Sequence, residues 1–293
     1  MHEKKWEVYV VTDLDPQAWP SGKGEILAGL NPEVISRYRE RYGENWSESC
    51  LRDFQEQIKE YEKIRRELDQ LLDRLKKEVG LSESEAISPE QMTELEQKLP
   101  EDLRQKEKEL RQKAYAYIGR VSVEVGDVVT FPALQVHSLQ HGIRVIEFQT
   151  PHYERLIVMF AQKVLTQNHW DTDRAMDLIN TEPYRLPEPQ LLTEEDGYLE
   201  ERIVDFPDFS SERIRMDENV SRKFQCEGRY HLIICVKGKL RLESQSGSSL
   251  ELLPEEAVFL PASTSFYRVT NSGADSMIFL RAVPVKAHSA KLD

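Results

Sequence analysis

The chain has 293 residues, of which 39 are Lys or Arg and 52 are Asp or Glu, so its formal net charge is −13. This acidity argues against a nucleic-acid partner, because binding to phosphates needs a surplus of clustered Lys and Arg. Apolar runs such as 156–161 are far shorter than the roughly 20 residues of a membrane-spanning helix, so no membrane partner is expected. The start MHEKKWEVYVV lacks a signal-peptide pattern, and three cysteines suit a reducing compartment, so we expect a cytoplasmic protein.

Residues 1–31 predict two β-strands. WEVYVV is a run of β-branched and aromatic residues, and EILAG follows a turn-rich stretch that contains proline and glycine. The pattern then becomes helical over 32–116, where residues 51–113 hold 17 acidic and 14 basic side chains and a single glycine. We therefore expect two short strands followed by a highly charged helical insertion.

An apolar seam at alternating three- and four-residue spacing, broken by Arg65, runs along the first part of this insertion. Its members are Leu51, Phe54, Ile58, Tyr61, Leu68, Leu72, Leu75 and Val79. A second helix is expected after Ser88, which can cap a helix whose first position is Pro89. The insertion is predicted to be an antiparallel helical hairpin, whose seam packs either within the chain or across a dimer through self-association.

The chain turns β-rich from Tyr117, with runs YIGRVSVEVGDVVTFPA, IRVIEFQT and RLIVMFAQKVL, and is so again from Arg202. Residues 166–201 form a polar linker, with a short helix expected at DTDRAMDLI. Two segments echo each other, GDVVTFPALQVHSL and PEEAVFLPASTSFYRV, which implies two similar domains. Many short strands separated by turns favour antiparallel barrels.

The first of these two segments, GDVVTFPALQVHSL, contains a motif with a candidate metal ligand. Gly126, Pro132 and His137 keep the spacing of the second cupin motif, although Leu134 replaces its second glycine and His141 stands where asparagine is common. Imidazole is a standard ligand for zinc and related ions, so His137 is a candidate metal ligand. The alternative is a structural histidine that follows a Pro-Ala turn.

The stretch VEVGDVVTFPALQVHSLQHGIRVIEFQT resembles the catalytic cupin of class I mannose-6-phosphate isomerases (phosphomannose isomerases). The opening KWEVYVV looks like that family's K-x-E strand, and ICVKGKLRLE with AVFLPAST resembles its C-terminal cupin. The resemblance implies a mainly β chain of two cupin (jelly-roll) barrels, the first interrupted by a helical hairpin insertion. Its implied domains are an N-terminally incomplete catalytic-type cupin (1–31 and 117–165), the helical insertion (32–116), the linker (166–201) and a metal-free C-terminal cupin (202–293).

The resemblance also implies roles for single residues. Glu7 and His137 would be metal ligands, Lys5 would line the sugar site, and Glu147 would lie on the active-site strand. Arg155 is the candidate arginine for the phosphate, although it follows Glu147 by fewer residues than the family pattern leads us to expect. Strand alternation at least puts Lys5 and Glu7 on one face.

The zinc site that the resemblance implies lacks the strand that supplies two of its ligands in the family. A catalytic zinc usually has three protein ligands and an open position. The family draws two ligands from a Gln-x-His strand before the K-x-E strand, and here only four residues precede Lys5. His2 has the opposite strand parity to Glu7 and is predicted to point away, whereas His141 and His152 are other substitutes.

The expected activity is interconversion of mannose 6-phosphate and fructose 6-phosphate through an enediol, with one zinc ion stabilising the developing oxyanion. A sugar phosphate is the expected partner, held by a locally positive pocket. One alternative is a weak or inactive cupin that binds a sugar or acts as an interaction module. Another is a cupin dioxygenase, which needs more histidines than this chain has.

Overall fold

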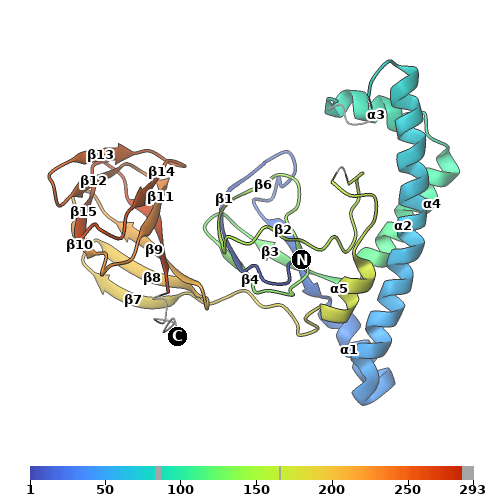
Figure 1. Cartoon of the computed structure of the whole chain (residues 1–293), viewed down its shortest axis with the longest axis horizontal. Helices are drawn as coiled ribbons and strands as arrows, with labels where there is room; N and C mark the ends of the chain where they lie inside the picture. Colours follow the sequence, from blue (N-terminus) through green and yellow to red (C-terminus); the bar gives the residue numbers. More distant parts are fainter. Residues whose placement is uncertain (83–86, 165, 286–293) are drawn as a thin grey trace, which may run out of the picture.

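A computed structural model describes residues 1–82, 87–164 and 166–285. Two β barrels lie side by side, and helices cover the first barrel on the side away from the second (Figure 1). The predicted architecture, mainly β with two barrels and a helical insertion in the first, is confirmed.

The first barrel consists of two three-stranded antiparallel sheets with strand orders β4-β1-β6 and β3-β2-β5. Tyr9 and Val11 of β1 face the core of this barrel, whereas Val8 and Val10 face the second barrel. Because both faces of β1 are covered, its residues 8–11 form a continuous apolar run. The strands are β1 (Glu7–Leu14), β2 (Gly24–Leu30), β3 (Ile118–Val123), β4 (Val128–Phe131), β5 (His137–Ser138) and β6 (Ile143–Gln149).

The helical insertion separates β2 from β3. The side chain of Asn31 caps its first helix, and Ser88, the predicted helix cap, forms a capping box with Gln91 at the third. The long second helix pairs with the fourth (Figure 1), as predicted for a helical hairpin. The elements are α1 (Pro32–Tyr42), the 3₁₀ helix η1 (Gly43–Asn45), α2 (Trp46–Glu78), α3 (Pro89–Gln97) and α4 (Glu101–Tyr115).

The apolar seam of α2 packs within the chain. Phe54, Ile58 and Tyr61 are fully buried in a core shared with α4 and with apolar residues that follow β6, whereas Val79 is half exposed. Arg65, which breaks the seam, is also buried, and its guanidinium pairs with Asp69 at 2.8 Å. The seam therefore serves the fold of one chain.

The prediction of a strand at RLIVMFAQKVL (155–165) is wrong. Residues 155–164 have no regular secondary structure, and Leu165 lies outside the described residues. Their backbone groups bond elsewhere: the Ile157 N–H donates to the Asp171 carboxylate at 2.8 Å, and the Val158 carbonyl accepts from the Thr172 hydroxyl at 3.1 Å. The run is apolar because it packs against α2, not because it belongs to a sheet.

The second barrel follows the short helix α5 (Thr172–Leu178), which was predicted. Its two sheets have strand orders β10-β15-β12-β13 and β14-β11-β16-β9-β8-β7, and the first two strands begin within the interval 166–201. The strands are β7 (Gln190–Glu195), β8 (Tyr198–Asp205), β9 (Phe209–Met216), β10 (Ser221–Gln225), β11 (His231–Lys237), β12 (Leu240–Ser244), β13 (Ser249–Leu252), β14 (Ala257–Leu260), β15 (Phe266–Asn271) and β16 (Met277–Pro284).

The two similar sequence segments contain the same kind of turn, one before β4 and one before β14. Before β4, Gly126 takes φ 98° and its N–H donates to the Val11 carbonyl at 2.8 Å. Before β14, Glu255 takes φ 74° and its N–H donates to the Cys235 carbonyl at the same distance. The same local structure therefore recurs at equivalent points of the two barrels.

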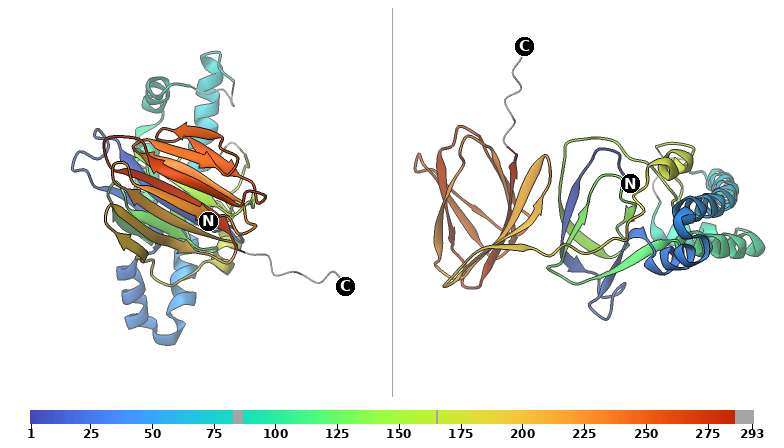
Figure 2. Two further views of the ribbon diagram at one scale, coloured as in Figure 1. Left: turned by 90° about the vertical axis from the view of Figure 1, so that its left-hand side faces the viewer. Right: turned by 90° about the horizontal axis from the view of Figure 1, so that it is seen from below.

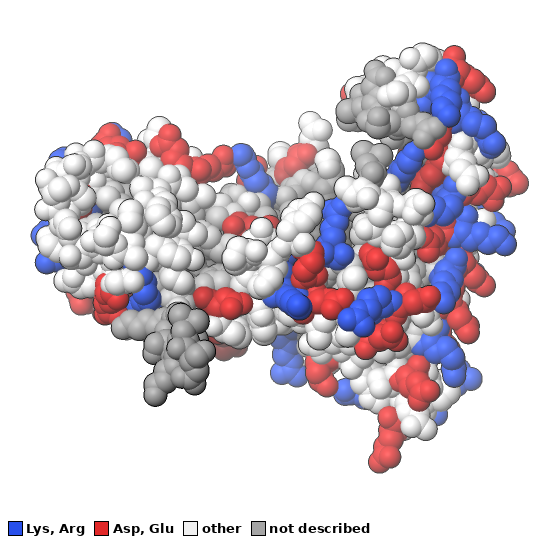
Figure 3. Space-filling view, viewed as in Figure 1, with Lys and Arg blue, Asp and Glu red and all other residues white. Residues whose placement is uncertain are grey.

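The barrels meet through an apolar interface. Val8 and Val10 of β1 pack with Ile203, Leu280 and Ala282 of the second barrel, and the right view of Figure 2 shows the two barrels side by side. Charged side chains of both signs cover the visible face of the helical insertion (Figure 3). Among the described residues, every helix is too polar or too short to cross a bilayer.

Candidate metal centre and active site

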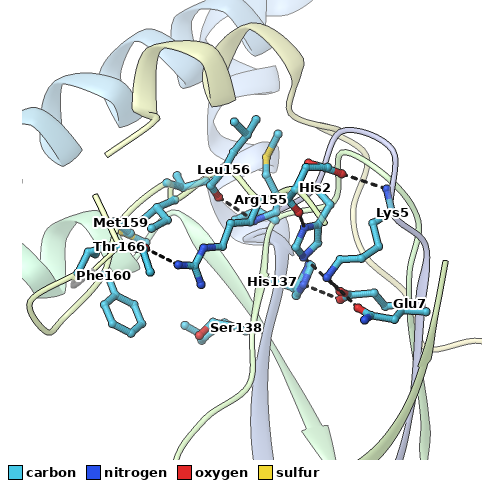
Figure 4. Close-up of a pocket in the computed structure, with 18 of the residues that line it drawn as sticks. His2, Lys5, Glu7, His137, Ser138, Arg155, Leu156, Met159, Phe160 and Thr166 are labelled. Carbon is cyan, nitrogen blue, oxygen red and sulfur yellow. Dashed lines mark hydrogen bonds and ion pairs between the residues drawn. The ribbon is translucent and has the colours of Figure 1, made fainter. Parts of the chain in front are cut away.

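A cavity of about 640 Å³ opens in the first barrel, between its strands and the irregular segment after β6. Polar side chains from β1, β5 and β6 form one wall, and apolar residues of the 156–164 segment form another (Figure 4). The volume lies within the roughly 300–1,000 Å³ of typical small-molecule sites. A hexose phosphate is of suitable size for such a cavity.

Glu7, the first residue of β1, lies at the centre of the polar wall and is 1% exposed. Its Oε1 lies 2.6 Å from Lys5 Nζ and 3.2 Å from His2 Nε2, and its Oε2 lies 3.0 Å from His137 Nε2. Burial by itself would raise the pKa of the Glu7 carboxyl, but His137, His2 and Lys5 hold this pKa well below its usual range. Glu7 is therefore a buried carboxylate that attracts cations.

His137 begins β5 and stacks on the ring of Phe131, with ring centroids 4.1 Å apart. Its Nδ1–H donates to the backbone carbonyl of Gln135 at 2.8 Å. Burial lowers the pKa of His137 despite the opposing effect of Glu7, so the neutral imidazole is favoured. A neutral ring that donates through Nδ1 keeps a lone pair on Nε2, the atom that faces Glu7.

The prediction that His2 points away is wrong. Strand β1 begins at Glu7, and the backbone bends at Glu3 and Lys4, so the alternation of a regular strand does not extend to His2. Its Nδ1–H donates to the backbone carbonyl of Glu154 at 2.5 Å, which directs Nε2 toward Glu7. The alternation of side chains along a strand does not apply to His2, because the backbone bends between His2 and Glu7.

His2, Glu7 and His137 form a three-residue donor set whose ligand atoms all lie within 4.8 Å of one another. Both imidazoles use Nδ1–H on backbone carbonyls, so both can present Nε2 lone pairs to a carboxylate. Each Nε2 needs a cation between it and the Glu7 carboxylate, either a proton that bonds the ring to Glu7 or a metal ion in place of that proton. Histidines that ligate metals usually donate their other ring N–H to a carbonyl or carboxylate, as both rings do here. Two imidazoles and one carboxylate suit zinc and related divalent ions, so the residues present fit the metal that the family resemblance implied.

Two other predicted residues, Lys5 just before β1 and Glu147 on β6, line the same cavity. Lys5 Nζ donates to Gln149 Oε1 at 2.9 Å as well as contacting Glu7. Glu147 lies opposite Tyr9 in the β1–β6 pairing, and its pKa is raised to about 7 by burial and by the neighbouring Glu7 carboxylate. Lys5 and Glu147 thus lie beside the donor set, where a bound substrate can reach them.

Arg155 lies along the irregular segment, away from the donor set, and its guanidinium donates to the Thr166 hydroxyl (Figure 4). The residue is exposed and lines the cavity together with Ser138 and Lys163. Lys163 is bound to both carboxylate oxygens of Asp73 at 2.7 Å, so Arg155 has more of its donors available than Lys163.

Sequence reasoning missed two functional candidates, Tyr9 and Glu154. The Tyr9 hydroxyl donates to Glu7 Oε2 at 2.9 Å, which the shared parity of Tyr9 and Glu7 on one strand would have suggested. The Glu154 contact with His2 joins residues far apart in the chain and left no local signal. His141 and His152, the other substitutes considered, are exposed and lie outside the donor set.

The sequence matches no protein-family model and no curated protein. Among solved structures, the fold is similar to mannose 6-phosphate isomerase from Bacillus subtilis, at 12% identity and a TM-score of 0.56 over 95% of this chain and 64% of that one. It is also similar to a mutant of phosphomannose isomerase from Salmonella typhimurium, at 15% identity and a TM-score of 0.55 over 96% of this chain and 66% of that one. The chain therefore shares the fold of these isomerases and spans slightly less than two thirds of their length.

Proposed function

We propose that this protein is a metal-dependent isomerase that interconverts mannose 6-phosphate and fructose 6-phosphate. The donor set of His2, Glu7 and His137 carries the proposal, because it lies in a cavity of suitable size beside Lys5 and Glu147. The isomerase fold supports the same reaction. A bound zinc ion would supply Lewis-acid polarisation of the substrate oxygens.

The chain's own residues suit the proton transfers that this reaction requires. Removal of the proton from C2 of the aldose forms an enediol as O1 gains a proton, and loss of the O2 proton with protonation of C1 then gives the ketose. Glu147 faces the cavity from β6 and is our candidate for the group that takes the C2 proton and returns it to C1. Lys5 Nζ is a donor for the substrate oxygens next to the donor set.

Arg155 is the proposed phosphate anchor. It lies at a different part of the cavity from Glu7 and His137, so a sugar phosphate could put its reacting carbons near the donor set and its phosphate near the guanidinium (Figure 4). Arginine suits phosphate because its planar N–H groups form paired hydrogen bonds to two oxygens. Thr166 fixes the guanidinium on its other side.

The decisive experiment measures metal content after purification and turnover of mannose 6-phosphate with and without added zinc. We expect zinc-dependent turnover, and Glu147→Gln is expected to reduce kcat by about 10²- to 10⁴-fold while the protein keeps its fold and its metal. Glu25→Gln is the matched control, because Glu25 lies on the same barrel in an exposed pair with Arg120. Sugar binding without turnover would instead favour the inactive cupin, and copurified iron would favour the dioxygenase.

A further inference from the structure

The interior of the second barrel changes from apolar to charged along its strands. On β9, Met216 and Ile214 face the apolar core, and the next residue of the same parity is Glu212. On β16, Phe279 faces the core and Arg281 follows at the same parity. One end of this barrel is therefore packed as a core, and the other end is a polar chamber.

Charged groups in the chamber are paired at short distances. Arg281 lies 3.2 Å from Glu212 and 2.9 Å from Glu200, and its side chain is 14% exposed. Arg222 lies over the Tyr198 ring at 4.6 Å and pairs with Glu195. Burying such charges costs free energy that an apolar packing would avoid, so stability alone does not account for them.

Several donors in the chamber have no partner. The Tyr267 hydroxyl lies 2.9 Å from His231 Nδ1. When the Tyr267 O–H donates to Nδ1, the neutral His231 ring carries its proton on Nε2. Among the described residues, that buried Nε2 has no hydrogen-bond partner, and neither do the Nε–H groups of Arg222 and Arg229.

These residues line a cavity of about 470 Å³. Five basic and four acidic side chains border it, so the cavity has one surplus positive charge in a chain whose net charge is −13. We propose that the second barrel has its own binding site, for a small hydroxyl-rich carboxylate such as a sugar acid. The guanidinium groups of Arg222 and Arg229, whose side chains are 35% and 28% exposed, would bind the carboxylate, and the carboxylates of Glu200 and Glu212 keep lone pairs that can accept sugar hydroxyls.

The charge of the cavity distinguishes this ligand class from a sugar phosphate. A phosphate monoester carries about −1.5 to −2 charges near neutral pH, more than the single surplus positive charge can balance. A neutral sugar would leave that surplus without a partner. The site is thus distinct in chemistry from the cavity of the first barrel, and the proposal does not depend on isomerase activity.

The test is calorimetric titration of the whole protein with D-glucuronate, with D-glucose as the neutral counterpart and inorganic phosphate as a second anion. We expect glucuronate to bind at least about tenfold more tightly than glucose or phosphate, which corresponds to one charge-assisted hydrogen bond. Arg222→Gln and Arg229→Gln should each weaken glucuronate binding about tenfold. Two variants are used so that misfolding of one does not leave the proposal without a test.

Two controls assign the binding to this cavity. Arg241→Gln removes a comparable exposed arginine on β12, paired with Glu243, and should leave glucuronate affinity unchanged. His137→Ala alters the first barrel and should also leave it unchanged. The proposal is overturned if glucuronate does not bind, if glucose binds equally well, if phosphate binds equally well and the two arginine variants weaken it, or if His137→Ala and not the arginine variants abolishes glucuronate binding.

Discussion

His2 is held against Glu7 by Glu154, a residue 152 positions away in the chain. The backbone carbonyl of Glu154 accepts from His2 Nδ1 at 2.5 Å, and its carboxylate accepts the backbone N–H groups of Glu3 and Lys4 at 2.9 and 2.8 Å. One residue thus orients the imidazole and fixes the bend that brings it to Glu7.

Glu154→Ala is therefore expected to weaken zinc binding although Glu154 is not a ligand. The substitution keeps the backbone carbonyl that accepts from His2 Nδ1 and removes the carboxylate that fixes the bend, so we expect a loss of about tenfold, the lower end of the roughly 10- to 100-fold range for groups that orient a metal ligand. Competition with a chromophoric chelator measures it. Glu3→Gln is the control, because it removes an acidic side chain of the same segment that pairs with exposed Arg174. Equal affinity of Glu154→Ala and the unchanged protein would show that His2 does not depend on this bend.

The donor set itself gives a stronger prediction. His2→Ala and His137→Ala should each lower zinc affinity by more than the roughly 100-fold upper range for orienting groups, because each removes a ligand atom. His141→Ala should leave zinc affinity unchanged, since His141 is exposed and outside the donor set. Zinc retained at one ion per chain in His2→Ala would restrict the site to Glu7 and His137.

The helices α2 and α3 could be predicted from the sequence because helical periodicity and helix capping involve residues that are close together in the chain. The seam that includes Phe54 and Ile58 predicted α2, and Ser88 followed by Pro89 predicted the start of α3. The expected strand at 155–165 failed because its apolar residues are buried by α2 and not by a sheet, a tertiary effect that composition does not reveal.

The candidate site was predictable in part for the same reason. Lys5 and Glu7 share one side of one segment, and Lys5 Nζ reaches the Glu7 carboxylate. His2 was misjudged because the bend that moves it depends on Glu154, which is far away in sequence. Local spacing can relate residues on one strand, but it cannot locate a contact that tertiary structure creates.

Arg155→Ala should affect substrate binding more than metal binding. Loss of charge-assisted hydrogen bonds to phosphate is expected to raise KM for mannose 6-phosphate about 10- to 100-fold. If the phosphate is held equally in ground and transition states, kcat changes little. Steady-state kinetics with zinc present measures both parameters. Arg120→Ala, an exposed arginine of β3, is the control, and an unchanged KM in Arg155→Ala would exclude Arg155 as the anchor.

Phe54→Ala tests the attachment of the helical insertion to the first barrel. Phe54 is fully buried and stacks on Tyr117 with ring centroids 4.9 Å apart. Truncation of a buried phenylalanine typically costs about 3–5 kcal/mol of unfolding free energy, and we expect that range from urea denaturation. Val79→Ala on the same seam should change it by less than about 0.5 kcal/mol, because Val79 is 50% exposed.

His231 gives the second barrel a pH-dependent stability. Burial, with the nearby Arg281 and Arg229, lowers the pKa of this imidazole to about 4. In the unfolded chain the pKa is near 6.5, so between these values the unfolded state binds more protons. The contribution of His231 to stability is therefore complete above about pH 6.5 and is lost as the pH falls toward 4.

The unfolding free energy lost between pH 6.5 and pH 4 should be on the order of 2–3 kcal/mol, because a shift of one pKa unit corresponds to about 1.4 kcal/mol. Carboxylates also titrate in this range, so the measurement compares the unchanged protein with His231→Gln, whose amide can accept from Tyr267 but does not titrate. Urea unfolding at several pH values, in buffers free of carboxylates that could enter the chamber, should give a shallower pH slope for His231→Gln. If the unfolding free energy of the two proteins depends on pH with the same slope, the pKa of His231 is the same in the folded and unfolded chains.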